Sequence, residues 1–382
     1  MQLKKNDYHS HRIHQKKTSL RELAGLFIKL GATAFGGPTV HIAMMQKEVV
    51  DKRQWMDHQH FLDLVGATNL IPGPNSTEMA IHIGHERAGW KGLLVAGCCF
   101  IFPAVIITGL IAWLYQRYGQ LPAISPFIYG IKPAVIPIIL AAVFPLGKKA
   151  FKTMELRVIG AMALAASLAG LNEIVVMFGA GFLILLLLLV RSNRGRIMSF
   201  LFLEIPFFSE ANLRIFLIFL KIGAILYGSG YVLFAFLDNE LVAKGLLTRT
   251  QLMDAIAVGQ FTPGPVFSSV TFIGWQLNGF YGSVMATVAV FLPSFIFVAL
   301  LNPLVPGMRR SKMFSAFIDG VNAASVAIIV AVCIAFARET VSDWRMALIS
   351  AFSLAATFGF QKLNTVFVIL GSALLGYALL HL

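Results

Sequence analysis

Asn69-Leu70-Ile71-Pro72-Gly73-Pro74-Asn75-Ser76-Thr77-Glu78 is the stretch that decides the fold, because it lies in a strongly apolar segment and yet cannot form an unbroken helix. Pro72 and Pro74 each remove an N–H donor, and Gly73 loosens the backbone between them. We expect a helix to restart at Asn75, with Glu78 three residues later in a capping-box-like pattern. The same break returns in the second half of the chain as Gln260-Phe261-Thr262-Pro263-Gly264-Pro265.

A break of this kind has consequences if it lies at membrane depth. Non-helical backbone is tolerated there only where it is buried in protein or lines a wet cavity. A helix that starts at such a place directs N–H groups and a partial positive charge at the cavity, which suits an anion. The two breaks therefore predict an anion site.

The composition predicts an all-α integral membrane protein. The chain has 382 residues, of which 57% are hydrophobic and 13% charged, whereas soluble domains have about 45–50% and about 25%. Its apolar runs, such as 182–190, are continuous and do not alternate as in a β-barrel. The net charge of +13 is typical of a positive-inside excess in cytoplasmic loops and is compatible with an anion-attracting vestibule. Nucleic-acid binding is not expected, because the basic residues are scattered between the spans.

The N-terminal tail, residues 1–22, is polar and basic and contains no apolar run of a signal peptide, so we expect it in the cytoplasm. Three histidines of the tail form a loose cluster, for which a disordered tail is favoured over metal capture: His9, His11 and His14. Three cysteines lie in apolar segments and form no disulfide or zinc pattern: Cys98, Cys99 and Cys333. We expect no metal and no cofactor.

The second half of the chain repeats the first. Lys29-Leu30-Gly31-Ala32 returns as Lys221-Ile222-Gly223-Ala224, and Pro72-Gly73-Pro74 returns as Pro263-Gly264-Pro265. This predicts a first membrane repeat at 23–190, a linker at 191–212 and a second membrane repeat at 213–382. Paired repeats with a broken helix in each half indicate a secondary transporter with its site at the repeat interface.

The relative orientation of the repeats follows less directly. The basic loops 148–152 and 309–312 occupy different places in the two repeats, which favours an inverted relation. A cytoplasmic tail and a cytoplasmic basic linker instead imply an even number of crossings and a parallel relation. The segment 58–88 decides between them, since it either crosses the membrane or dips in and returns. We prefer inverted repeats.

Several motifs resemble the chromate ion transporter family in its long-chain form with two homologous halves. They are Phe35-Gly36-Gly37-Pro38, the stretch 69–78, Tyr227-Gly228-Ser229-Gly230 and Thr262-Pro263-Gly264-Pro265. The resemblance extends from about residue 23 to residue 335. It implies a multi-pass transporter of the bacterial inner membrane that exports chromate, draws on the proton gradient and confers chromate resistance. Chromate and the lipid bilayer are the expected partners, and a homodimer is left open.

The candidate substrate contacts are donors at the breaks and a repeated lysine. Asn75, Ser76 and Thr77 present side-chain and backbone donors at a helix start, although capping the helix uses the same groups. Lys29 and Lys221 hold equivalent positions, with snorkelling to the headgroups as the alternative. The expected substrate-binding set is Lys29, Gly36, Gly37, Asn69, Gly73, Asn75, Ser76, Thr77, Lys221, Gln260, Thr262 and Gly264.

Proton coupling is assigned to Glu78, His41 and His82. Glu78 is either a capping partner or a carboxyl group that is protonated when the anion is bound, and the histidines titrate near neutral pH or simply pack. We expect Glu48 and Glu240 to pair with Lys or Arg.

The second break lacks the polar cap and the acid. Val266, Phe267 and Ser269 stand where the first repeat has Asn75, Ser76 and Glu78. The first repeat is therefore expected to do most of the anion binding.

An enzyme is not expected. His82-Ile83-Gly84-His85-Glu86 has the order His-x-x-His-Glu, whereas zinc proteases need His-Glu-x-x-His or its inversion. The alternatives that remain are a channel and a transporter for another oxyanion such as sulfate, because tetrahedral dianions of similar size differ little in shape.

Overall fold

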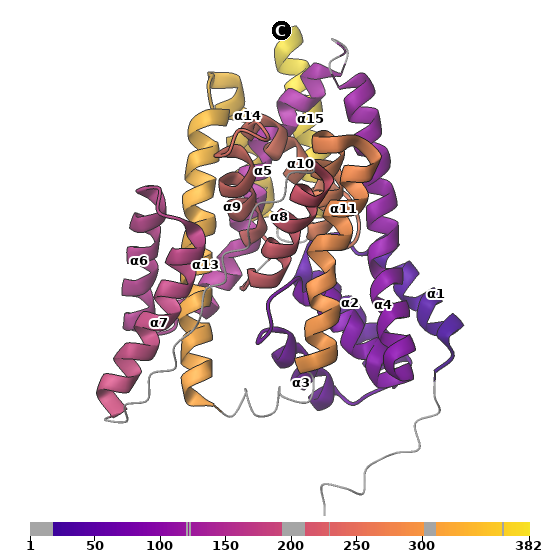
Figure 1. The fold of residues 1–382 in the computed structure, drawn as a ribbon. Helices are drawn as coiled ribbons and strands as arrows, with labels where there is room; N and C mark the ends of the chain where they lie inside the picture. Colours follow the sequence, from indigo (N-terminus) through magenta and orange to yellow (C-terminus); the bar gives the residue numbers. More distant parts are fainter. Residues whose placement is uncertain are drawn as a thin grey trace, which may run out of the picture.

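The computed structural model describes residues 18–119, 121, 124–192, 211–228, 230–301, 311–360 and 363–382, and this part of the chain is helical without strands (Figure 1). The histidine cluster of the tail, most of the expected linker, Ser229 and the arginines of the 309–312 loop lie outside the described residues.

Each repeat contains the same series of helices. The first repeat consists of α1 (Leu20–Thr33), α2 (Pro38–Gln46), the π-helix η1 (Lys47–Lys52), α3 (His58–Thr68), α4 (Asn75–Tyr118), α5 (Ser125–Ala150), α6 (Met154–Leu168) and α7 (Glu173–Ser192). The second consists of α8 (Ala211–Ile225), α9 (Val232–Leu237), the π-helix η2 (Asp238–Val242), α10 (Arg249–Phe261), the 3₁₀ turn η3 (Val266–Ser268), α11 (Ser269–Leu301), α13 (Lys312–Thr340), α14 (Trp344–Gly359) and α15 (Thr365–His381).

The motif Phe35-Gly36-Gly37-Pro38 lies between α1 and α2 and separates them. Gly36 and Gly37 there have φ values of 109° and 83°, which only glycine adopts readily. Pro38 then starts α2 at the first helical position, where its missing N–H costs nothing.

The segment 58–88 folds back on itself. Helix α4 has non-helical φ and ψ at Ala88 and Gly89, so residues 75–87 form a short arm that folds back against the long span. At the turn Gly84 and Gly92 are so close that a Cβ on either would overlap the other's carbonyl group. His60 Nε2 lies 3.4 Å from Glu86 Oε2, which places the start of α3 beside the end of this arm. Together α3 and the arm form a helical hairpin, called here the first hairpin, with its tip at 69–75.

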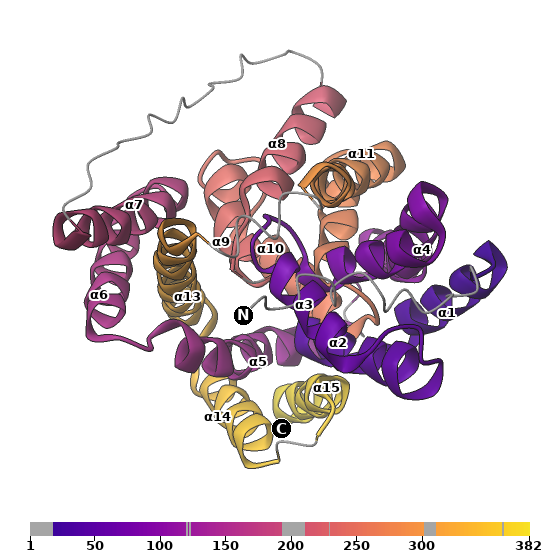
Figure 2. The ribbon, with the colours of Figure 1, turned by 90° about the horizontal axis from the view of Figure 1, so that it is seen from below.

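The second repeat builds an equivalent second hairpin from α10 and the first arm of α11, with its tip at 260–266. Its kink falls at Asn278 and Gly279, and Gly274 meets Gly282 as Gly84 meets Gly92. The two hairpins lie near the middle of the molecule when it is viewed along the helices (Figure 2).

The two repeats interleave around these hairpins. Helices α6 and α7 of the first repeat pack on α13 of the second, and α14 and α15 of the second pack on α5 of the first (Figure 2). Helices α4 and α11 contact each other, and so do α5 and α13. Because each repeat covers the other, neither is an independent domain in space.

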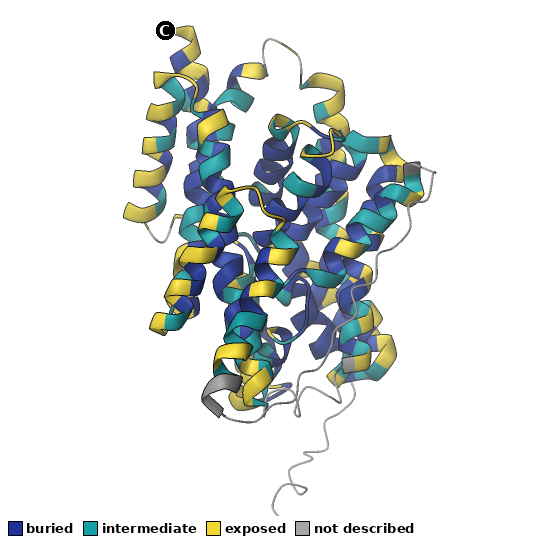
Figure 3. Cartoon of the chain, turned by 60° about the vertical axis from the view of Figure 1, so that its left-hand side comes forward, coloured by how far each residue is buried: buried dark blue, intermediate teal, exposed yellow. Residues whose placement is uncertain are grey.

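The buried residues gather at the centre, around α9, α10 and the hairpin tips (Figure 3). In the described part of the chain, four segments are long and apolar enough to cross a membrane, two from each repeat: Asn75–Tyr118, Ser125–Ala150, Val266–Leu300 and Lys312–Thr340.

The glycines of the hairpin turn provide a test of this fold. Gly84→Ala should destabilise the protein by about 1–3 kcal/mol, because the new methyl group overlaps Gly92 and Ala96. Gly25→Ala in α1 is the matched control, since its methyl group meets no atom within 4 Å and alanine favours a helix by roughly 0.5–1 kcal/mol. Thermal unfolding of the purified protein should therefore shift in opposite directions. A Gly84→Ala protein as stable as Gly25→Ala would contradict the hairpin.

Candidate functional site

The two hairpin tips are fixed to each other's repeats by a reciprocal pair of backbone hydrogen bonds. Gly73 N–H donates to the carbonyl of Leu226 at 2.8 Å, and Gly264 N–H donates to the carbonyl of Ala34 at 2.9 Å. Both glycines have positive φ values, 138° and 89°. Each tip therefore closes on the residue at which the first helix of the opposite repeat ends.

The tip glycines also meet equivalent positions on the long spans. A Cβ on Gly73 would overlap Ser294 Oγ and Glu78 Oε1, and a Cβ on Gly264 would come within 2.8 Å of the Ala104 Cβ. Ala104 directly follows Pro103 in α4, and Ser294 directly follows Pro293 in α11. The backbone arrangement is thus repeated at the two tips, but the side chains are polar at one and apolar at the other.

Glu78 is the central polar group of the first tip. Its side chain has no exposed surface, and neither carboxyl oxygen has a hydrogen-bond partner of good geometry, although Ser294 lies beside it. An unsatisfied buried polar group costs about 1–3 kcal/mol, and more if it is charged. Such a group is expected where a proton or a ligand satisfies it in the working cycle.

Further unpaired polar atoms surround the tips. Buried nitrogen or oxygen atoms without a hydrogen-bond partner belong to Thr77, His82, Gln260, Thr262, Ser269 and Ser294. His82 follows Glu78 by four residues and therefore lies on the same face of the short arm of α4. This density of unsatisfied polar atoms distinguishes the tips from an ordinary apolar core.

The capping role considered for Asn75 and Glu78 is wrong. The N-cap of α4 is Pro74, in an extended conformation, and it makes no side-chain capping bond. Because proline takes the cap position, Asn75 is already helical, and its amide donates instead to Asn69 Oδ1 at 2.6 Å. The two asparagines thus form a polar pair at the tip, with Asn69 exposed and Asn75 half-buried.

The break between α1 and α2 meets the second tip. A Cβ on Gly37 would lie 2.9 Å from Tyr231 Oη. The same hydroxyl lies 3.5 Å from Gln260 Oε1. His41 Nε2 is 3.1 Å from the Ala34 carbonyl, which also binds Gly264. Gly36 is exposed in the same interruption.

Lys29 and Lys221 form ion pairs away from the unpaired cluster. Lys29 Nζ lies 3.3 Å from Glu48 Oε1, and Lys221 Nζ lies 2.8 Å from Glu240 Oε1. Glu48 also binds Lys52 and Arg53, and Glu240 also binds Lys244. The predicted pairing of both glutamates is confirmed, and a substrate contact of either lysine stays a prediction.

The histidine-rich segment 82–86 forms no metal centre. Among the described residues no group of three or more His, Cys, Asp or Glu side chains could hold a metal ion. Glu86 instead binds His60, and this hydrogen bond is the largest cause that raises the pKa of His60 above its ordinary value. This pair joins α3 to the short arm of α4 at the base of the first hairpin.

Sequence reasoning missed Ser294 and Tyr231. Ser294 of the second repeat lies at the first tip, and Tyr231 lies between Gly37 of the first repeat and Gln260 at the second tip. The signal in the sequence that could have indicated Ser294 was its place directly after Pro293 in an otherwise apolar span.

The fold and the site define a helical membrane transporter with an internal repeat. A model of the chromate transporter family matches residues 21–185 and again residues 213–377. The chain belongs to the chromate transporter family.

Two chromate transport proteins match nearly the whole chain, and a third relative matches part of it. The chromate transport protein of Cupriavidus metallidurans is 30% identical over 386 residues, which are 97% of this chain and 96% of the relative. The chromate transport protein of Pseudomonas aeruginosa is 29% identical over 94% of this chain and 92% of its own length. An uncharacterised transporter of Bacillus subtilis, YwrA, is 26% identical over 120 residues, 31% of this chain but 67% of that protein. No solved structure matches the chain.

The ion pairs of Lys29 and Lys221 are expected to contribute different amounts to the free energy of unfolding. Lys221→Gln leaves buried Glu240 with Lys244 alone, so we expect a loss of about 1–2 kcal/mol. Lys29→Gln leaves Glu48 with Lys52 and Arg53, so we expect a loss below about 1 kcal/mol. Thermal unfolding measures both changes. A greater loss from Lys29→Gln than from Lys221→Gln would contradict these pairings.

Proposed function

We propose that this protein is a secondary transporter that exports chromate, a tetrahedral oxyanion, across the bacterial inner membrane by alternating access. The observation that carries the proposal is the pair of broken hairpins, each bonded through its tip glycine to the end of the first helix of the opposite repeat. A helix start with free N–H groups at such a place is a binding site for an anion. The printed names of the full-length relatives support chromate as the anion.

The anion would bind between the tips and against the start of α4. Asn69 and Asn75 would form the accessible side of this place, because Asn69 is exposed and Asn75 is half-buried beside it. Ser76 and Thr77 behind them are buried. The tips must therefore move apart for the anion to pass, and the two glycine hydrogen bonds are the contacts that such a movement breaks.

An inverted relation of the repeats is part of the proposal. In Figure 1 the end of α4 and the start of α5 lie at the top, whereas the end of α11 and the start of α13 lie at the bottom. Equivalent helix ends on opposite sides support inverted repeats. In an inverted pair, exchange of the two repeats' conformations opens the site first to one side and then to the other. The N-terminus would be cytoplasmic.

Glu78 would couple the proton to the anion. A buried carboxylate without a partner repels a dianion at the same tip, whereas a protonated Glu78 does not. Anion and proton therefore bind together, and a dianion with one proton carries a net single negative charge. An interior-negative membrane potential favours the outward movement of this single negative charge by about 2.3 kcal/mol per 100 mV. Export of chromate in this way would confer chromate resistance. His41 and His82 are the further candidates for moving the proton.

Flux into proteoliposomes tests the transport proposal. With sulfate as a competitor, purified protein should accumulate chromate in the vesicle lumen when the exterior is made more acidic, because proton and anion move together. A protonophore should abolish the accumulation. Flux that only equilibrates would show a channel, and equal handling of sulfate would show a general oxyanion transporter. No flux of either anion would overturn the proposal.

A substitution at the first tip tests the coupling. Glu78→Gln should transport chromate at a rate within about threefold of the wild type, since the neutral amide mimics the protonated acid. It should lose the response to the pH gradient. Glu86→Gln is the matched control, because Glu86 lies two turns along the same arm and binds His60 near the surface. Glu78→Gln with an undiminished pH response would remove Glu78 from the coupling.

A further inference from the structure

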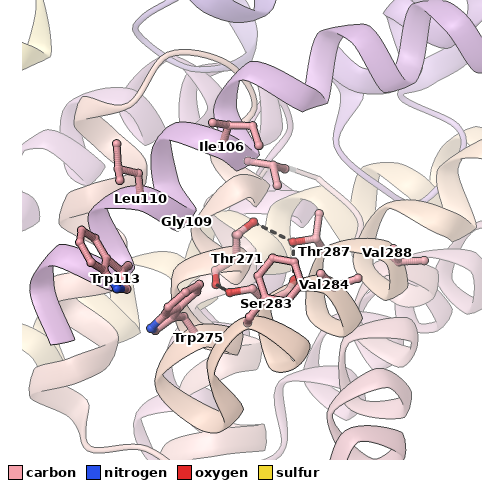
Figure 4. A pocket seen from close by; sticks show the side chains of 12 residues that line it. Ile106, Gly109, Leu110, Trp113, Thr271, Trp275, Ser283, Val284, Thr287 and Val288 are labelled. Atoms are coloured by element: carbon pink, nitrogen blue, oxygen red, sulfur yellow. Dashed lines mark hydrogen bonds between the residues drawn. The ribbon is translucent and has the colours of Figure 1, made fainter. Parts of the chain in front are cut away.

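Two cavities of the described structure differ sharply in character. The larger, of about 500 Å³, opens between α4 and α11 and is lined almost wholly by apolar side chains, with Trp113 and Trp275 at one end (Figure 4). Its few polar groups, Thr271, Ser283 and Thr287, bond to one another or to backbone. A surface of this kind between two spans suits lipid chains.

The second cavity is polar and lies where α4 ends and where α5 and α10 begin. Its volume is about 390 Å³, which is room for roughly ten water molecules. Most of its lining is polar: Tyr115, Ser125, Lys132, Thr248, Thr250 and Gln251. A polar cavity at the end of the spans can hold a hydrated ion.

Two lining residues of this polar cavity, Tyr115 and Lys132, contact a buried acid behind them, Asp254. Asp254 is 4% exposed, accepts a hydrogen bond of 2.6 Å from Tyr115 Oη and lies 3.5 Å from Lys132 Nζ. The tyrosine bond is short and the lysine contact is long. Tyr115 binds Asp254 Oδ2 and Lys132 lies beside Asp254 Oδ1. Because an ammonium group has three N–H donors, Lys132 can keep its contact with Asp254 and also donate to an anion in the cavity.

The polar cavity lies at the start of α10, and the second tip lies at the other end of the same helix. Six residues of α10, or about 9 Å at 1.5 Å per residue, separate Asp254 from Gln260. The equivalent of Lys132 in the second repeat is Asn322, so this cation belongs to one side of the molecule. The larger apolar cavity has no charged lining residue.

We propose that the polar cavity is the vestibule through which a dianionic oxyanion reaches the hairpin tips from one side of the membrane, with Lys132 as its receptor cation. This inference rests on the proposed oxyanion transport and adds to it a second place on the path, with residues outside the tips. Lys132 donates to the anion while it stays beside Asp254, Tyr115 keeps Asp254 in place, and the hydroxyl groups of Ser125 and Thr250 replace part of the anion's hydration.

Thiol labelling tests the vestibule independently of transport. Thr250→Cys is introduced into a protein whose Cys98, Cys99 and Cys333 are replaced by alanine. An anionic methanethiosulfonate should react faster than a cationic one, and Lys132→Gln should slow the anionic reagent about fivefold, as expected for the loss of one charge nearby. Lys132→Arg should keep the preference. Ala169→Cys, in the exposed turn after α6, is the control position and should not respond to Lys132→Gln.

Protection by an anion completes the test. Sulfate should slow labelling of Thr250→Cys but not of Ala169→Cys, and the protection should be lost in Lys132→Gln. Sulfate is the probe because chromate oxidises thiols. In proteoliposomes Lys132→Gln should raise the KM for chromate at least fivefold with kcat little changed.

The possible results separate this inference from the proposed function. Charge preference and protection in a protein that transports no oxyanion would keep the vestibule and overturn the transport proposal. Transport by the wild type, with neither charge preference nor protection at Thr250→Cys, would overturn the vestibule alone. An unchanged KM in Lys132→Gln would also overturn it.

Discussion

The reciprocal hydrogen bonds from Gly73 to Leu226 and from Gly264 to Ala34 are the contacts on which the rest of the structure depends. Each joins a hairpin tip of one repeat to the end of the first helix of the other. They require positive φ at the two glycines, which explains why each hairpin ends in Pro-Gly-Pro. The interleaving of α6 and α7 with α13, and of α14 and α15 with α5, then holds the outer helices around this centre. In the proposed mechanism, the contacts that move and the place that binds the anion coincide.

The two hairpin tips share the same backbone arrangement, but their side chains differ in polarity. At the first tip Gly73 meets Glu78 and Ser294, and at the second tip Gly264 meets Ala104. A symmetric backbone allows the two hairpins to exchange conformations. Unequal side chains allow one of them to bind a charged substrate without doubling the cost of burying polar groups. The unpaired polar atoms around Glu78 are consistent with a structure that is satisfied only when a proton or an anion is bound.

Features fixed by local chemistry could be predicted from the sequence, and features fixed by distant packing could not. The breaks at Pro72-Gly73-Pro74 and Pro263-Gly264-Pro265 follow from proline and glycine alone, and the pairing of Glu48 and Glu240 follows from nearby lysines at repeated positions. The interleaving could not be predicted, because helices that are apolar on all sides do not specify their neighbours. Ser294 was missed because its approach to Glu78 depends on that packing. The capping box failed because Pro74 occupies the cap position that the pattern assigned to Asn75.

The central claim is that the oxyanion binds between the hairpin tips, and anomalous diffraction tests it most directly. Crystals of the protein soaked in chromate and measured at the chromium absorption edge report the metal atom alone. The account predicts a strong peak within hydrogen-bonding reach of Asn75 and the start of α4, close to both tip glycines. A fully occupied chromium peak elsewhere in the membrane region, with none at the tips, would contradict it.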